Sequence, residues 1–241
     1  EESIKTNIIG TLNVVNACLE KDVKKAVMIS TDKACSPVNT YGACKFVSER
    51  IFTESNYNNG SKETIFTTVR YGNVLQSTGS VIPFFNSKIQ NGEKIPLTDA
   101  RMTRFIISPD QAVDLIINAL KYSIGGEVFI PKLPAFRITD LIEILQENAN
   151  KKSEIEVIGI RPGEKIHEEM VNISEVNRTY DFKNMFVIKS SIQEYSKIPN
   201  EPQYSRDGKQ ISEEDMKNYR SKDAVIPKNE VEELFKLLDL L

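Results

Sequence analysis

Apolar positions near the start of the chain follow two spacings, one typical of helices and one of strands. A helix is predicted over residues 4–21, because apolar residues recur there every three or four positions. These residues are Ile8, Leu12, Val15 and Leu19. The short apolar run at 24–30 predicts a strand that is buried on both faces.

The same two patterns then repeat. Asn39 or Thr40 can cap a helix that runs from Tyr41 to about Ser55, and the β-rich stretch 64–71 predicts a second buried strand. Alternation of helix and strand implies a parallel sheet with helices on both faces. We therefore expect an α/β fold with a Rossmann-like, doubly wound sheet that is incomplete at its N-terminus.

Beyond residue 80 the predicted elements are shorter and mixed. Helices are expected over 81–91, 108–122 and 138–148, and strands over 127–130 and 155–160. The inward face of the second helix is predicted to be Val113, Ile116, Ile117 and Leu120. We expect three parts: residues 1–80 from a Rossmann domain, 81–190 mainly a substrate-binding lobe with some return elements, and 191–241 a polar tail. An amphipathic helix over 231–241 should end the chain, docked on the body or on a partner.

Composition narrows the classes of function. The formal net charge is −3 over 241 residues, which does not favour nucleic acid as a partner. No apolar run approaches the roughly 20 residues of a membrane span, so no membrane association is expected. Three cysteines without CxxC spacing indicate neither a disulfide framework nor a metal site, and are typical of reduced thiols in a cytoplasmic protein.

Two features predict that the chain is an N-terminally truncated piece of a larger protein. It begins Glu1-Glu2-Ser3 without an initiator Met, and it contains no GxGxxG loop. In dinucleotide-binding folds that loop opens the first βαβ unit and receives the pyrophosphate. We expect residues 1–241 alone to be inactive and unstable.

The most informative residues follow the first predicted strand. Ser30-Thr31-Asp32-Lys33 stands where open α/β sheets place ligands, and Tyr41-x-x-x-Lys45 follows on the next helix. Residues four apart share a helix face, and a nearby ammonium favours the phenolate of a tyrosine. Tyr41 could then remove a proton from a hydroxyl group. The non-functional alternatives are that Tyr41 is a surface tyrosine beside a solvated Lys45, and that Asp32 and Lys33 form a surface salt bridge.

The second predicted strand ends in a glycine turn, Tyr71-Gly72-Asn73. Glycine there would let the backbone approach a ligand closely, although an ordinary connection between strand and loop has the same sequence.

Five segments together resemble the UDP-N-acetylglucosamine 4,6-dehydratase family of extended short-chain dehydrogenases/reductases. They are STDKACSPVNTYGACK, RYGNVLQSTGSVIPFF, TDARMTRFIIS, GGEVFIPKLPAFRITDL and IGIRPGEKIHEEM. The resemblance covers residues 4 to about 190. Relatives that retain C5 configuration typically carry Met at the position of Tyr41, so the resemblance implies the inverting branch, which supplies pseudaminic acid synthesis.

The resemblance implies roles for the residues after the first strand. Tyr41 would help to oxidise C4 while NADP accepts hydride, and Lys33 would remove and return the C5 proton. Asp32 would be the acid on the C6 hydroxyl, and Thr31 would bond the substrate near O4.

Further contacts are also carried over from the family. The cofactor would be NADP, contacted by Tyr41, Lys45, Val74, Leu75, Gln76, Ser77 and Thr78. UDP-N-acetylglucosamine would be held by Thr31, Asp32, Asn73, Val81, Thr98 and Arg161. The family implies a homo-oligomer, a hexamer by resemblance. His167, the only histidine, is assigned no role.

Two other interpretations stay open at this point. A nucleotide-sugar 4-epimerase or a retaining dehydratase would use the same Tyr-x-x-x-Lys pair, although an epimerase needs no acid and base for C5 and C6. A non-catalytic Rossmann remnant could instead use its tail and terminal helix to bind a partner.

Overall fold

The computed structural model describes residues 1–57, 60, 62–75, 81–191, 201–214, 219–238 and 240–241. The chain divides into two compact units, each assembled from three separate segments. Unit 1 comprises Glu1–Tyr71, Asp110–Lys132 and Glu169–Tyr219, and unit 2 comprises Gly72–Pro109, Leu133–Glu168 and Arg220–Leu241. The functional assignment of 1–80, 81–190 and 191–241 stays a prediction, but the return elements that it included are substantial.

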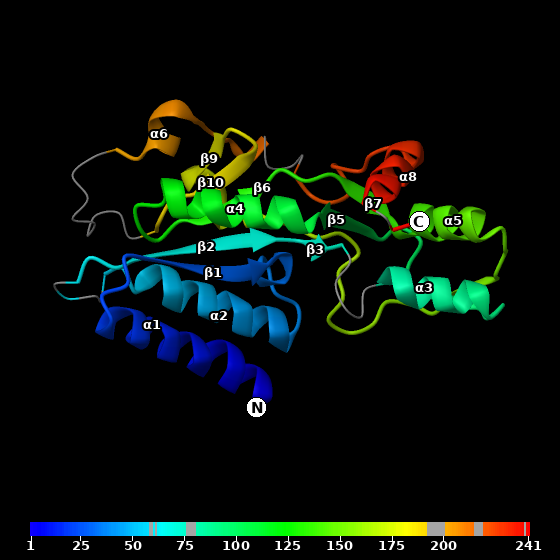
Figure 1. Cartoon of the computed structure of the whole chain (residues 1–241), viewed down its shortest axis with the longest axis horizontal. Coiled ribbons are helices and arrows are strands. Elements are labelled where there is room, and N and C mark those ends of the chain that lie inside the picture. The colour runs from blue at the N-terminus through cyan, green and yellow to red at the C-terminus, as the bar shows by residue number, and fades with distance from the viewer. Residues whose placement is uncertain (58–59, 61, 76–80, 192–200, 215–218, 239) are drawn as a thin grey trace. The chain divides into compact units, whose positions relative to one another are not determined.

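Unit 1 is built on a six-stranded sheet of order β1-β2-β6-β10-β9-β11 (Figure 1). The strands are β1 Lys25–Thr31, β2 Ile65–Tyr71, β6 Val128–Pro131, β9 Thr179–Phe182, β10 Met185–Ile188 and β11 Lys209–Gln210. The first three are parallel, with Thr31 opposite Tyr71, and the others pair antiparallel. The expected α/β fold with a Rossmann-like parallel sheet is confirmed.

Helices cover both faces of this sheet (Figure 1). On one face a π-helical turn, η1 Ile4–Ile9, leads into α1 Gly10–Glu20, which packs beside α2 Thr40–Glu54. Phe52 of α2 meets Phe66 of β2 edge to face there, with ring centroids 5.1 Å apart. On the other face lies α4 Pro109–Tyr122, whose Leu115 and Ala119 share a core cluster with Val69.

Two burial predictions were wrong. Strand β1 stands at one end of the sheet formed by the described residues, and Ile29 is 48% exposed rather than buried. In α4 the buried positions are Ala112, Leu115, Ala119 and Tyr122. Of the residues predicted to face inward, Val113, Ile117 and Leu120 are exposed, at 53%, 55% and 40%. Ile116 is partly buried against the core, as predicted.

The described residues of unit 2 form two small sheets and three helices. The sheets are β3 Asn73–Val74, β5 Thr103–Ile107 and β7 Ala135–Arg137, and separately β4 Ile95–Leu97 with β8 Ile155–Val157. The helices are α3 Val81–Gln90, α5 Ile138–Ala149 and α8 Lys228–Leu237. The predicted terminal helix docks on this unit, because Val231 and Phe235 are buried in the same core as Phe136.

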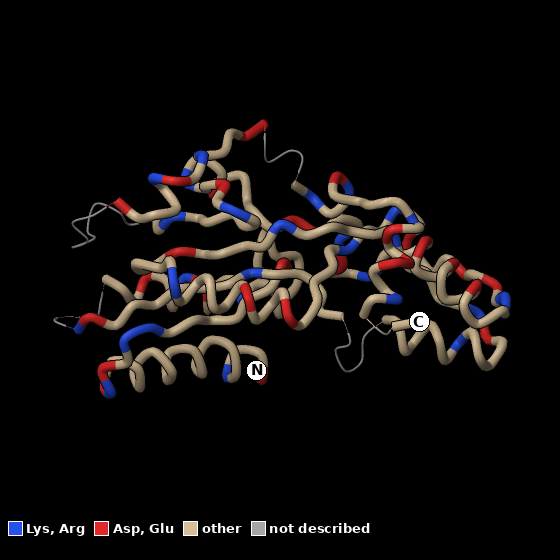
Figure 2. Tube along the Cα trace, turned by 45° about the horizontal axis from the view of Figure 1, so that its top comes forward, with Lys and Arg blue, Asp and Glu red and all other residues tan. Residues whose placement is uncertain are grey.

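Late segments complete the main sheet: some return elements were expected between residues 81 and 190, but a strand beyond residue 190 was not. A 3-10 segment, η3 Ile173–Arg178, leads into the β9–β10 hairpin, which turns at Lys183 with φ of +56°. The predicted polar tail contains α6 Gln203–Asp207, whose Tyr204 is buried against Phe129. Basic and acidic residues are interspersed along both units (Figure 2).

Candidate active site

A tight turn follows β1 and holds the acid and base candidates together. It is the 3-10 segment η2 Asp32–Ala34, and the Thr31 hydroxyl accepts from the Lys33 amide at 3.4 Å. The same hydroxyl donates to Asp32 Oδ1 at 2.9 Å, and Lys33 Nζ donates to that oxygen at 3.0 Å. The structure therefore brings Thr31, Asp32 and Lys33 into one hydrogen-bonded group at the carboxyl end of a strand.

The Asp32 carboxyl is fully buried, whereas the Lys33 side chain is 37% exposed. Among the described residues, Asp32 Oδ2 has no hydrogen-bond partner. An unpaired buried carboxyl oxygen is costly, so such groups need an explanation. A ligand hydroxyl is one partner that would satisfy it.

The start of α2 is fitted closely to this turn. Asn39 caps the helix, accepting from the Gly42 amide at 2.8 Å, as the sequence predicted. A Cβ added to Gly42 would lie 2.3 Å from the Lys33 carbonyl oxygen and 3.2 Å from Pro37 Cβ. Only glycine therefore lets the helix that carries Tyr41 approach the turn that carries Lys33. Sequence reasoning missed this residue.

Tyr41 and Lys45 differ in exposure. The Tyr41 side chain is 45% exposed, so its phenol can meet a ligand. Lys45 is half-buried and donates from Nζ to the Ile29 carbonyl oxygen at 3.0 Å. Burial lowers the pKa of the Lys45 ammonium, and the nearby Glu49 carboxylate opposes that shift. The hydrogen bond to β1 fixes this cation near the strand end.

A buried ionic cluster stands next to these residues and was also missed. Arg70, near the end of β2, uses all five of its N–H donors. They reach Glu49 at 2.6 and 3.1 Å, Glu175 at 2.9 and 3.1 Å, and the Met170 carbonyl oxygen at 2.8 Å. No sequence signal marks this cluster, because Glu175 lies 105 residues from Arg70.

The two carboxylates of the cluster hold Arg70 as a cation. Burial opposes the ionised form of Glu175, but the Arg70 charge outweighs it and lowers the pKa of Glu175 to about 2. The pKa of Arg70 is raised well above its usual value, since both glutamates outweigh the effect of its burial.

The remaining site candidates belong to unit 2. Asn73 is exposed in β3, and Val74 pairs with Ile107 of β5. Leu75 is 7% exposed and lies in the apolar core, so any cofactor contact from it would come from backbone atoms. Val81 begins α3 and is partly buried against the same core.

Thr98 and Arg161 follow the paired strands β4 and β8. Leu97 is opposite Val157 in that pair, and Thr98 is half-buried directly after it. The Arg161 side chain is 63% exposed, with only a long contact of 3.9 Å to Glu164, so its guanidinium is available to an anion. Gln76, Ser77 and Thr78 lie outside the described residues.

His167 is held in place by a hydrogen-bond chain in unit 2. Its Nδ1 lies 2.9 Å from the Thr103 hydroxyl, which lies 2.6 Å from the buried Ser221 hydroxyl. The described ranges contain no group of three or more His, Cys, Asp or Glu residues that could hold a metal. Within those same ranges no helix has both the length and the apolar character to cross a membrane.

A Rossmann-like sheet with Thr31 at a strand end and Tyr41-x-x-x-Lys45 on the following helix defines an extended short-chain dehydrogenase/reductase. Residues 1–190 match the polysaccharide biosynthesis protein family, and the chain belongs to that family.

Three known proteins are similar to this chain. The inverting UDP-N-acetylglucosamine 4,6-dehydratase of Campylobacter jejuni is 48% identical over 192 residues, which are 79% of this chain and 56% of that protein. A UDP-glucose 4-epimerase of Rickettsia rickettsii is 38% identical over 78% of this chain and 55% of that protein. The X-ray structure of Pen from Bacillus thuringiensis is 39% identical with a TM-score of 0.87, covering 100% of this chain and 71% of that one. The matched part of the chain thus spans little more than half the length of the curated dehydratase and epimerase.

Proposed function

We propose that this chain provides the catalytic residues of an NADP-dependent, inverting UDP-N-acetylglucosamine 4,6-dehydratase. The observation that carries the proposal is the ion pair between the buried Asp32 and the partly exposed Lys33 after β1, beside the helix that carries Tyr41 and Lys45. The 48% identical relative from Campylobacter jejuni, which is named as an inverting UDP-N-acetylglucosamine 4,6-dehydratase, supports it. The partner is UDP-N-acetylglucosamine, and the working protein is a cytoplasmic homo-oligomer.

The residues present fit the nicotinamide half of such a cofactor. Tyr41 offers an exposed phenol, and Lys45 offers a half-buried ammonium that is anchored to Ile29. When bound, NADP would supply the hydride acceptor for C4 and the hydride donor for C6. Tyr41 takes the proton of the C4 hydroxyl, and the Lys45 charge stabilises the phenolate that makes this possible.

The acid and the base for elimination are two residues that share a hydrogen bond. Lys33 Nζ donates to Asp32 Oδ1 at 3.0 Å. Moving one proton along that bond converts the ion pair into a free amine and a neutral carboxylic acid. The Lys33 amine then removes the C5 proton, which the C4 ketone has acidified, and Asp32 donates its proton to the departing C6 hydroxyl, which leaves as water. Lys33 finally returns a proton to the opposite face of C5, which inverts that centre.

Residues of both units contact the substrate in this proposal. Thr31 bonds the sugar near O4, and Asn73 and the pocket residues Val81 and Thr98 contact the nucleotide sugar. Arg161 binds the diphosphate, a role that suits its exposed fork of N–H donors.

Product analysis tests the proposal. The full-length protein, incubated with UDP-N-acetylglucosamine and NADP in deuterated water, should give a 4-keto-6-deoxy sugar with inverted C5 and one solvent deuterium at C5. NADPH should not accumulate, because the hydride returns to the product. Stoichiometric NADPH, or UDP-N-acetylgalactosamine as the product, would contradict the proposal.

The epimerase remains the second candidate, because the Rickettsia relative carries that name. Its reaction needs Tyr41 and Lys45 but leaves Asp32 and Lys33 without a chemical step. Retention of C4-epimerising activity in an Asp32→Asn, Lys33→Ala double variant would favour it.

A further inference from the structure

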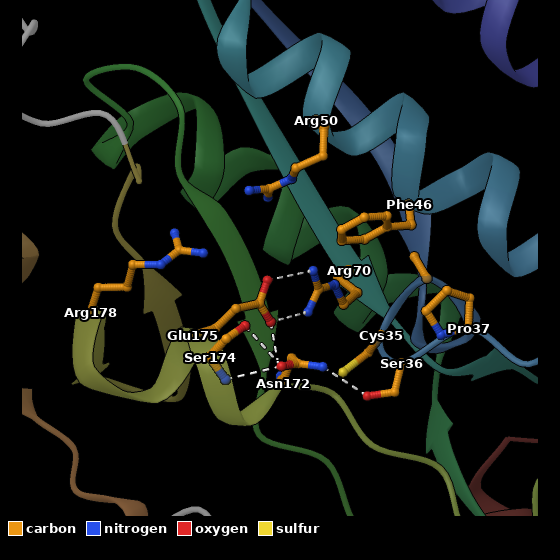
Figure 3. Close-up of a pocket in the computed structure, with 11 residues that line it drawn as sticks. Cys35, Ser36, Pro37, Phe46, Arg50, Arg70, Asn172, Ser174, Glu175 and Arg178 are labelled. Carbon is orange, nitrogen blue, oxygen red and sulfur yellow. Dashed lines mark hydrogen bonds and ion pairs between the residues drawn. The ribbon is translucent and has the colours of Figure 1, made fainter.

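A separate pocket opens in unit 1 behind the turn that carries Asp32 and Lys33. It has a volume of about 170 Å³ and is lined from three parts of the chain (Figure 3). One wall is the segment after η2, including Cys35 and Ser36; the second is Phe46 and Arg50 of α2; the third is η3. The Arg70 guanidinium and the Glu175 carboxylate form its floor.

The charges of this pocket do not balance. Both carboxylates of the cluster, Glu49 and Glu175, bond to Arg70 from two sides and use four of its N–H donors. Two further guanidiniums, those of Arg50 and Arg178, also line the pocket. Three arginines therefore face two glutamates, which leaves one positive charge in excess.

Arg50 and Arg178 extend from opposite walls toward the same space (Figure 3). Neither forms an ion pair with any carboxylate in the described part of the chain. Arg178 Nη1 donates to the Lys189 carbonyl oxygen at 2.6 Å, and the Arg50 guanidinium carbon lies 5.8 Å from the centre of the Phe46 ring. Arg50 Nε is buried and has no hydrogen-bond partner among the described residues.

Two guanidiniums that converge repel each other, and here neither forms an ion pair with a carboxylate among the described residues. Burial lowers the pKa of Arg178, Glu175 opposes that shift, and the Arg50 charge adds to it. Arginine forks match tetrahedral oxyanions in geometry as well as charge. A volume of about 170 Å³ is small beside the roughly 300–1,000 Å³ of sites for larger ligands.

We propose that this pocket binds a phosphate-type oxyanion, free or as the phosphoryl end of a phosphomonoester, between Arg50 and Arg178. The anion would neutralise the excess charge, and its oxygens would accept from both forks. The site is distinct from the proposed catalytic residues and does not depend on the dehydratase activity. Because Cys35 and Ser36 line it directly after η2, occupancy would also brace the turn that positions Asp32 and Lys33.

The experiment titrates the full-length protein with inorganic phosphate at constant ionic strength, without cofactor or nucleotide sugar, by calorimetry and thermal unfolding. We expect one phosphate per chain and a rise in melting temperature, since a ligand of the folded state stabilises it. Arg50→Gln and Arg178→Gln should each weaken binding by about tenfold or more, because each removes a charge-assisted fork. Arg178→Lys, which keeps the charge but loses the fork, should fall between.

Arg206→Gln is the matched control, since Arg206 is an exposed arginine of the same unit outside this pocket. It should leave phosphate binding unchanged. In chloride, Arg50→Gln should not lower the melting temperature, because it relieves repulsion; a merely structural role for Arg50 predicts a loss. A sugar phosphate that binds more tightly than phosphate would identify a phosphomonoester as the source, and equal binding would identify the free anion.

Three results would overturn the proposal. They are absence of phosphate binding, binding that survives the Arg50→Gln, Arg178→Gln double variant, and a change of oligomeric state in that variant without any phosphate effect. The last result would mean that a carboxylate of a second copy of the chain is the counterion. None of these results bears on turnover of UDP-N-acetylglucosamine, so failure here and failure of the dehydratase proposal are distinguishable.

Discussion

Unit 1 contains two ionic groups with buried carboxylates that differ in how completely their hydrogen bonds are satisfied. Arg70 has all five N–H donors paired by Glu49, Glu175 and a backbone carbonyl, and we call this group the closed cluster. Asp32 shares one oxygen between Thr31 and Lys33, and its other oxygen has no partner among the described residues. We call Asp32 and Lys33 the open pair. The closed cluster links distant segments of the chain, whereas the open pair keeps bonding capacity for a ligand, which agrees with the catalytic role that we propose for it.

The largest effect is expected where the open pair is broken. Lys33→Ala in the full-length protein should lower dehydration by roughly two to four orders of magnitude, the usual cost of losing a general base. Substrate binding should be nearly intact, and NADPH should form transiently because Tyr41 and Lys45 remain. Product assays and NMR of C5 deuterium measure this. Lys21→Ala, at an exposed lysine, is the control; wild-type exchange at C5 in the Lys33 variant would remove Lys33 as the base.

Breaking the closed cluster should lower the stability of the protein rather than its catalytic rate. Arg70→Met leaves Glu49 and Glu175 buried without a counterion, and removing one partner of such a group typically costs about 3–5 kcal/mol. Denaturant unfolding measures the loss. Adding Glu49→Gln and Glu175→Gln should restore part of the stability, because the orphaned charges are then gone. A loss below about 1 kcal/mol in the single variant would show that the cluster is not structural.

Gly42 lies where the helix that carries Tyr41 packs against the turn that carries the open pair, so a substitution there should affect both. Gly42→Ala places a methyl group 2.3 Å from the Lys33 carbonyl oxygen, so the turn or the helix must shift. Overpacking of this kind costs about 1–3 kcal/mol, and we expect turnover to fall by at least about tenfold as Lys33 moves relative to Tyr41. Gly10→Ala is the matched control, with its nearest contact at 3.7 Å. Equal effects of the two substitutions would contradict a positioning role.

The smallest expected effect is the loss of stability at low pH that comes from Glu175. The pKa of Glu175 in the folded protein is about 2, well below its unfolded value of 4.5. A lowered folded-state pKa stabilises the protein above the unfolded value, and this contribution is lost as pH falls from 4.5 toward 2. Unfolding free energy should drop by about 1 kcal/mol between pH 5 and pH 3.5 from this group. Glu175→Gln should flatten that part of the pH profile; an unchanged slope would assign it to other carboxylates.

What could be predicted from sequence was local. The cap at Asn39, the two parallel strands and the placement of Asp32, Lys33, Tyr41 and Lys45 all follow from residues close together in the chain. Contacts between distant segments could not be read in this way. The Arg70–Glu175 pair and the β9–β10 hairpin depend on residues that return to unit 1 after segments of unit 2. The buried face of α4 depends on the strands against which that helix packs.

The six alternating segments of the two units also govern how the molecule can assemble. The chain passes from one unit to the other five times, and the last strand of the main sheet, β11, ends only at Gln210. The core of unit 2 likewise includes Phe235, which is close to the end of the chain. During synthesis neither unit can reach its final packing much before the other, and long-range pairing of this kind is slow. A ribosome-bound chain that stops near residue 170 would therefore expose apolar residues of both incomplete cores at once. We expect chaperones to bind such a chain.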